Sequence, residues 1–128
     1  MTVPLPSSDP ATAAGAPRHW AERKASEHLQ AKGWRLLASN YRLRGGELDL
    51  VLESGRTVVI VEVKQRKSAA YGHPAESIDR RKLARIRATA QHYVSYVLGR
   101  PDAEVRLDAV LIMGTEQRHQ VQHLENIG

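Results

Sequence analysis

Residues 46–66 read GELDLVLESGRTVVIVEVKQR, and this stretch predicts two β-strands joined by a tight turn. The two apolar runs are rich in Val, Leu and Ile, and Ser54-Gly55 between them is a turn-forming pair. In the second run, Val59, Val61 and Val63 cover one face, while Val58 and Ile60 begin the other. This pattern indicates a strand that is covered on both sides.

The position of the turn decides which charged residues meet across the hairpin. If Ser54 and Gly55 form a two-residue loop, Glu47 lies opposite Glu62. Asp49, opposite Ile60 in that register, then becomes a diagonal neighbour of Glu62, at roughly 7–8 Å between backbones. Because side chains alternate along a strand, the three acids emerge on one face, which also carries Lys64.

Acids on a covered strand require a compensating cation. A buried carboxylate is costly, and neighbouring carboxylates raise each other's pKa unless a cation lies between them. Oxygen ligands without cysteine favour Mg²⁺ or Mn²⁺, which can polarise a phosphoryl oxygen and lower the pKa of a bound water. Lys64 could orient that water or offset charge on the phosphate. The alternative is that these charges protect a strand end from aggregation or form a surface ion pair.

The segment before the hairpin predicts a helix between Pro17 and Gly33. Ala21, Ala25 and Leu29 recur every four residues, which indicates one buried stripe. Glu22 lies about 20° around the helix from Leu29, so it borders the buried face.

The remaining elements predict a mixed α/β fold with the order αβββαββ and helices packed on one main sheet. The second helix has an apolar stripe bordered by Lys82. The other predicted elements are a strand over 34–43, a helix from Pro74 to about Leu98, and strands over 104–113 and 118–124.

Composition predicts one domain and a polyanionic partner. The chain has 128 residues, and residues 1–17 hold four of its six prolines, which predicts a disordered tail before a single domain over 18–128. Nineteen Lys and Arg against 14 Asp and Glu give a net charge of +5, which is typical of nucleic-acid binding. No cysteine, signal peptide or membrane-length apolar run is found, which predicts a cytoplasmic protein without membrane contact.

Two motifs in this hairpin resemble those of a known nuclease superfamily. Gly46-Glu47-Leu48-Asp49 followed by Val61-Glu62-Val63-Lys64 is similar to the D…ExK core of PD-(D/E)xK nucleases. More closely, residues 18–128 resemble the bacterial YraN-like family, which is related to archaeal Holliday-junction resolvases. Further matching residues are Ala21-Glu22, Asn40-Tyr41-Arg42, Tyr71-Gly72-His73-Pro74, Lys82, Val105-Arg106-Leu107-Asp108 and His123-Leu124.

The resemblance implies a restriction-endonuclease-like fold and a metal-dependent nuclease. By position, Asp49 and Glu62 would hold Mg²⁺ or Mn²⁺, and Lys64 would be the catalytic lysine. Glu22 would be an additional acid from the first helix. The resolvase relatives act as two-fold dimers, which implies a possible homodimer for this chain by analogy.

The expected substrate is nucleic acid, above all DNA with a branched or otherwise unusual structure. Two other readings stay open: a catalytically inactive nucleic-acid-binding domain that keeps the fold, and a protein-interaction module whose charges are structural. The residues expected to contact phosphates, most of which flank the predicted site, are Arg42, Arg44, Arg66, Lys67 and Lys82.

Overall fold

The structure, a computed structural model, describes residues 19–68 and 79–128. The predicted tail over 1–17 and Pro74 lie outside these ranges. The predicted order of helices and strands is confirmed, with a π-helical turn added after the second helix. The elements are α2 (Trp20–Gln30), β1 (Arg35–Leu43), β2 (Gly46–Ser54), β3 (Thr57–Arg66), α3 (Arg80–His92), η4 (Tyr93–Val97), β4 (Val105–Gly114) and β5 (His119–Leu124).

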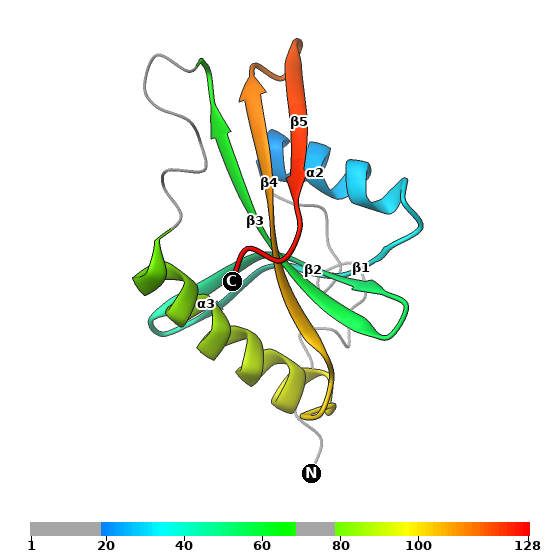
Figure 1. Ribbon diagram of the computed structural model, residues 1–128, viewed down its shortest axis with the longest axis vertical. Coiled ribbons are helices and arrows are strands. Elements are labelled where there is room, and N and C mark those ends of the chain that lie inside the picture. The colour runs from blue at the N-terminus through cyan, green and yellow to red at the C-terminus, as the bar shows by residue number, and fades with distance from the viewer. Residues whose placement is uncertain (1–18, 69–78) are drawn as a thin grey trace.

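The five strands form one mixed sheet in the order β1-β2-β3-β4-β5. Neighbouring strands are antiparallel except β3 and β4, which are parallel and are connected through α3. The sheet is strongly twisted, because β1 and β2 run across the view of Figure 1 while β4 and β5 run along it. This arrangement is consistent with the predicted restriction-endonuclease-like α/β fold.

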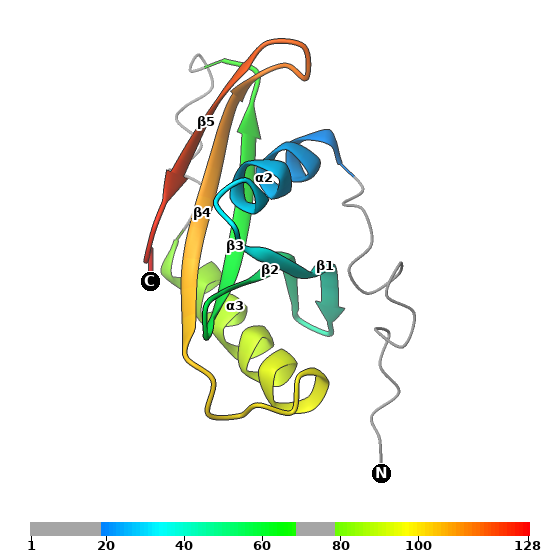
Figure 2. The same cartoon turned by 90° about the vertical axis from the view of Figure 1, so that its right-hand side faces the viewer.

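The two helices pack on opposite faces of the sheet, because along β3 the core under α2 uses Val59 and Val61 while the core under α3 uses Val58 and Ile60. In both views α2 lies beside the upper part of the long strands, and α3 lies beside the lower part (Figures 1 and 2). The core under α2 contains Ala21, Ala25, Leu29, Leu50, Leu52, Val59, Val61, Val110 and Ile112. The core under α3 contains Ala38, Leu48, Val51, Val58, Ile60, Ile86, Ala90, Tyr93, Val94 and Leu107.

A side-chain cap marks the start of each helix. The His19 side chain accepts a hydrogen bond from the Ala21 N–H, so α2 begins at Trp20. The Asp79 side chain accepts from the Lys82 N–H, and α3 begins at Arg80. Among the described residues, no helix is long and apolar enough to cross a membrane.

The turn of the central hairpin lies one residue later than predicted. Ser54 pairs with Thr57, so the loop residues are Gly55 and Arg56. Gly55 has a φ of +61°, and a two-residue loop of type II′ takes glycine at its first position. The predicted loop placed Gly55 second, which is why the predicted register was wrong.

Gly46 lets α3 approach the beginning of β2. A Cβ atom at this position would overlap the Thr89 hydroxyl oxygen, which donates a hydrogen bond to the Arg85 carbonyl. We expect Gly46→Ala to lower the free energy of unfolding by about 1–3 kcal/mol, because overpacking forces a backbone shift. Chemical denaturation of this variant and of Gly46→Ala combined with Thr89→Ala tests the cause. Full additivity of the two substitutions would contradict the proposed overlap.

Candidate active site

Asp49 and Glu62 lie where two neighbouring strands part. The pairing of β2 with β3 ends at Leu50 and Val61. Beyond this point β2 continues beside β1, and β3 continues beside β4. In the observed register Asp49 and Glu62 are the next residues on each strand and therefore lie opposite each other. The shifted turn moves the pair from diagonal to facing, while the predicted shared face is kept.

The orientation of Asp49 is set by the backbone of the neighbouring strand. Its Oδ2 accepts a hydrogen bond of 2.9 Å from the Val63 N–H. The side chain thus satisfies a main-chain donor at the point where strand pairing has ended. This bond holds the Asp49 carboxylate beside β3, and so beside Glu62.

A pocket of about 230 Å³ opens at this fork. Asp49 and Glu62 line it from the sheet, and Lys82 and Arg85 line it from α3. The Glu62 side chain is only 4% exposed, and its Oε1 lies 3.2 Å from the Lys82 Nζ. The pocket is therefore a polar site built from the sheet and from α3 on one of its faces.

The two acids share an environment that disfavours their negative charges. Burial, followed by the charge of Glu62, raises the pKa of Asp49 to about 7. Burial also raises the pKa of Glu62, although Lys82 and Lys64 partly offset this effect. Such a pair gains stability from a cation that binds both carboxylates.

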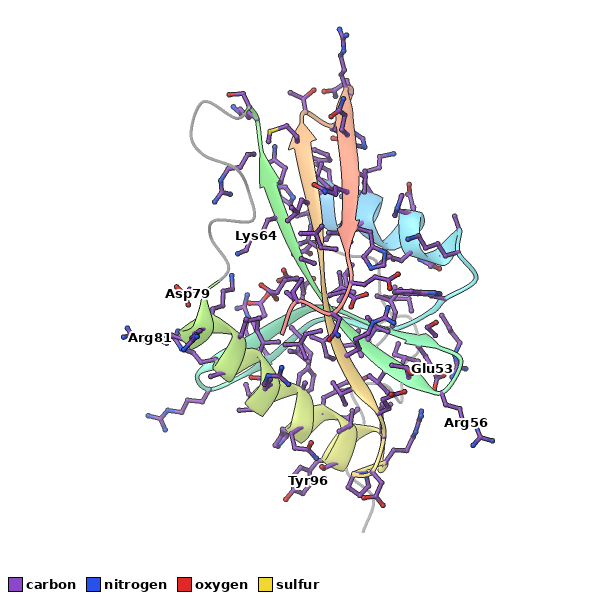
Figure 3. All side chains as sticks on the ribbon, in the orientation of Figure 1. Glu53, Arg56, Lys64, Asp79, Arg81 and Tyr96 are labelled. Carbon is purple, nitrogen blue, oxygen red and sulfur yellow. The ribbon has the colours of Figure 1, made fainter. Side chains whose placement is uncertain are left out.

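Lys64 and Lys82 supply the positive charge beside these acids. Lys64 projects from β3 on the side where the first turn of α3 lies (Figure 3). Burial lowers the pKa of Lys64, and contact with Lys82 lowers it further. Burial acts in the same direction on Lys82, but its contacts with Lys64 and Glu62 outweigh burial and raise its pKa.

The donor chemistry of the pocket fits Mg²⁺ or Mn²⁺. Asp49 and Glu62 contribute carboxylate oxygens, which hard divalent ions prefer. Over 19–68 and 79–128, no group of three acidic or imidazole side chains is arranged around one ion position. Two protein carboxylates are nevertheless sufficient for Mg²⁺, which keeps several waters and binds substrate phosphates in such sites.

Glu22 reaches the edge of the site through Asn40. The Asn40 Nδ2 donates a 3.0 Å hydrogen bond to Glu22 Oε1, and the Glu22 charge contributes to the raised pKa of Asp49. Asn40 lies opposite Asp49 in the sheet, between the Ser39 and Tyr41 pairings. Its φ of +54° is unusual within a strand.

Asn40 and Arg85 were not predicted as site residues. Asn is depleted in strand interiors, so its place in an otherwise strand-like run was the available signal for Asn40. For Arg85 the sequence offered only an exposed position on the second helix, and its place in the pocket depends on how α3 packs.

Among the described residues, Lys82 is the predicted phosphate-contacting residue that lines the pocket. Arg42 and Arg44 are exposed and precede the glycines that line it, and Arg42 forms a 3.0 Å ion pair with Glu47. Arg66 ends β3, and Lys67 follows it as an exposed residue. Lys82, the fifth predicted residue, lines the pocket and forms an ion pair with Glu62.

A further buried acid, Asp108, belongs to a separate structural network. It is fully buried and accepts two hydrogen bonds from Arg106, of 2.9 and 2.8 Å. It also lies 2.7 Å from His123 Nε2 and accepts from the Asn126 N–H at 2.9 Å. Because Lys32 Nζ contacts the other ring nitrogen and can only donate, Nε2 carries the proton directed at Asp108.

A five-stranded mixed sheet with α2 and α3 on its two faces is consistent with the restriction-endonuclease-like class of α/β proteins. Within that class, the chain belongs to the family described as Uncharacterised protein family UPF0102, whose model matches residues 21–112. This confirms the predicted membership in the YraN-like family.

Relatives with the same family name cover most of the chain. A UPF0102 protein of Thermus thermophilus is 45% identical over 105 residues, 82% of this chain and 90% of that protein. A UPF0102 protein of Dechloromonas aromatica is 44% identical, covering 80% of this chain and 82% of that protein. One from Beutenbergia cavernae is 42% identical, covering 85% and 92% respectively.

Proposed function

We propose that this protein is a Mg²⁺- or Mn²⁺-dependent phosphodiesterase that hydrolyses nucleic acid, with structured or branched DNA as its substrate class. The observation that carries this proposal is the facing pair Asp49 and Glu62 in a pocket, with Lys64 two residues along the same strand face. Lys82 and Arg85 in the pocket lining and the net charge of +5 support a polyanionic substrate.

The reaction is the addition of water to phosphorus and the departure of a sugar oxygen. A new bond forms between the water oxygen and phosphorus, and the water loses a proton. The bond from phosphorus to the sugar oxygen breaks, and the sugar oxygen takes up a proton, so that protons balance overall. A bound Mg²⁺ or Mn²⁺ would supply Lewis-acid polarisation of the phosphate and activation of water. Asp49 and Glu62 would hold the ion, and the Val63 N–H keeps Asp49 in place. Lys64 would stabilise charge that develops on the phosphate oxygens.

A cleavage panel tests the proposed activity. Single-stranded, duplex, flap and four-way DNA, with RNA equivalents, are incubated with Mg²⁺, Mn²⁺ or EDTA. We expect cleavage that requires the metal and is strongest on flap or four-way DNA. Absence of cleavage on every substrate, with either metal, would contradict the proposal.

Nucleic-acid binding without cleavage is the second candidate function. The 3.2 Å ion pair between Lys82 and Glu62 favours it, because an ammonium already compensates one of the two acids. Binding that weakens steeply with salt, together with no hydrolysis, would identify this function. Binding that is absent at low salt would instead favour a protein-interaction module.

The other predicted phosphate-contacting residues should contribute to binding independently of the chemistry. We expect combined replacement of Arg42, Arg44, Arg66 and Lys67 by Ala to weaken duplex DNA binding. The plot of log K against log salt has a negative slope, and its magnitude should decrease by about 0.9 for each phosphate contact that is lost.

Arg56→Ala is the matched control for this experiment. Arg56 is exposed at the hairpin turn, far from Lys64 (Figure 3). Its substitution should leave the slope unchanged. An unchanged slope in the fourfold variant would place the binding surface elsewhere.

A further inference from the structure

Lys82 is a basic residue of α3 that lines the pocket. The Lys82 Nζ lies 3.2 Å from Glu62 Oε1. Among the described residues, Lys82 is the basic residue that forms an ion pair with Glu62. The Glu62 side chain is 4% exposed, whereas that of Lys82 is 35% exposed. The acid is therefore fixed and buried, while the lysine reaches it from the rim.

The ammonium of Lys82 can move without any change in the fold. Lys82 lies in the first turn of α3, and Asp79 caps this turn through the Lys82 backbone N–H. The cap thus holds the backbone, while four flexible methylene groups carry the ammonium. Rotation of this stem would take the charge from Glu62 toward the mouth of the pocket.

A divalent cation and this ammonium compete for the same carboxylate. Both require the Glu62 oxygens, and their like charges repel strongly at such short range. The displaced ammonium would still be at the rim of the pocket, next to Arg85. A phosphate of the bound nucleic acid is the group that would compensate it there.

We infer that Lys82 is an exchangeable counter-cation that couples metal binding to nucleic-acid binding. It neutralises Glu62 in the ion-free protein, leaves when Mg²⁺ or Mn²⁺ binds, and then contacts a substrate phosphate. This inference rests on the proposed function, since it takes Asp49 and Glu62 as the metal ligands. It adds that the metal makes a phosphate-binding group available.

The first test measures Mn²⁺ affinity without nucleic acid. Free Mn²⁺ is followed by electron paramagnetic resonance during titration of the wild type, Lys82→Met and Arg81→Met. Methionine keeps the length of the side chain without its charge, and Arg81 is an exposed neighbour on α3. We expect Lys82→Met to bind Mn²⁺ about fivefold more tightly or better, and Arg81→Met to match the wild type. Equal affinity in all three proteins would overturn the inference.

The second test measures DNA affinity with and without metal. The background is Lys64→Ala, in which cleavage is expected to stop, and the ligand is four-way DNA in Mn²⁺ or in EDTA. Adding Lys82→Met should weaken binding about fivefold in Mn²⁺ and leave it unchanged in EDTA, where Lys82 is held by Glu62. An equal loss in both conditions would show that Lys82 contacts a phosphate whether or not metal is bound, and would overturn the inference.

A third measurement covers the case in which Lys82→Met does not fold. Reductive methylation with ¹³C labels the lysines of the wild type, and the Lys82 resonance is followed while Mg²⁺ is added. It should shift with saturation of the site, while that of the exposed Lys67 should not. An unchanged Lys82 resonance at saturating Mg²⁺ would overturn the inference.

The proposed function and this inference can fail separately. A wild type that binds Mn²⁺ and shows the Lys82 effects, yet cleaves nothing, would contradict only the proposed catalysis. A wild type that cleaves with Mn²⁺, while Lys82→Met leaves metal and DNA affinity unchanged, would contradict only the inference. A wild type that does not bind Mn²⁺ at all would contradict both.

Discussion

Asp49→Asn should reduce cleavage at least about a thousandfold while leaving the fold intact. The metal's Lewis acidity is worth several kcal/mol of transition-state stabilisation, and each 1.36 kcal/mol is a factor of ten in rate. Asn retains an oxygen that can accept the hydrogen bond from Val63, so the fork between β2 and β3 should persist. Single-turnover cleavage of the best substrate in the panel measures the loss.

The same substitution should stabilise the ion-free protein at high pH. The pKa of Asp49 is raised from an ordinary value near 3.8 to about 7. A carboxyl with a raised pKa favours the folded state while it is protonated, and it loses that contribution as the pH rises from about 4 through 7. Asp49→Asn removes this loss, so its melting temperature should exceed that of the wild type at pH 8 and match it near pH 4.

The response to metal distinguishes a role of Asp49 as a metal ligand from a purely structural role. Mn²⁺ should raise the melting temperature of the wild type, because a ligand at 100 times its Kd stabilises the folded state by about 2.7 kcal/mol. Asp49→Asn should lose most of this rise. Lys64→Ala should keep it while losing cleavage, since an ammonium cannot be a metal ligand. Destabilisation by Asp49→Asn, with no response of the wild type to Mn²⁺, would instead indicate a structural ion pair.

Asp108→Ala should produce the largest loss of stability among single substitutions of the described acids. It removes the acceptor of two Arg106 bonds and one Asn126 bond, and it leaves a partly buried guanidinium without its partner. Breaking a buried charge pair costs about 3–5 kcal/mol, which corresponds to a fall of about 15 °C or more in melting temperature for a domain of this size.

The network around Asp108 joins separate parts of the chain. His123 contacts Asp108 from β5, and the nearby Ile127 N–H donates to the Leu107 carbonyl at 2.7 Å. Loss of Asp108 should therefore loosen the C-terminal segment first. Asp102→Ala is the control, because Asp102 is exposed and should change stability by no more than about 0.5 kcal/mol.

The contribution of Asp108 to the free energy of unfolding should depend on pH. Burial acts to raise its pKa, but the hydrogen bonds from Arg106, Asn126 and His123 outweigh burial and lower it. A carboxyl with a lowered pKa contributes stability above its unfolded value, about 3.9, and loses that contribution as the pH falls. Denaturant unfolding should therefore show the gap between wild type and Asp108→Asn narrowing below about pH 4. A constant gap down to pH 2 would contradict the role of the charge.

Local patterns in the sequence determined the elements and the face that carries the candidate site. Asp49, Glu62 and Lys64 share a face because side chains alternate with period two, and this parity survived the error in the turn. A shift of the loop by one position moves the register by two residues, which changes partners without exchanging faces. The buried stripe of α2 follows in the same way from the helical period, which is also a local property.

Tertiary structure decided which groups meet. The loop at Gly55 and Arg56 put Asp49 directly opposite Glu62, and the parting of β2 from β3 opened the pocket between them. Lys82 reaches Glu62 only because α3 packs against the face of β2 and β3 that carries the pocket. Asn40 reaches Glu22 only because α2 lies beside β1. These contacts join residues 13 or more positions apart, and their geometry depends on strand order and twist. No periodicity along the chain specifies it, so the sequence predicted the acids and the structure supplied their partners.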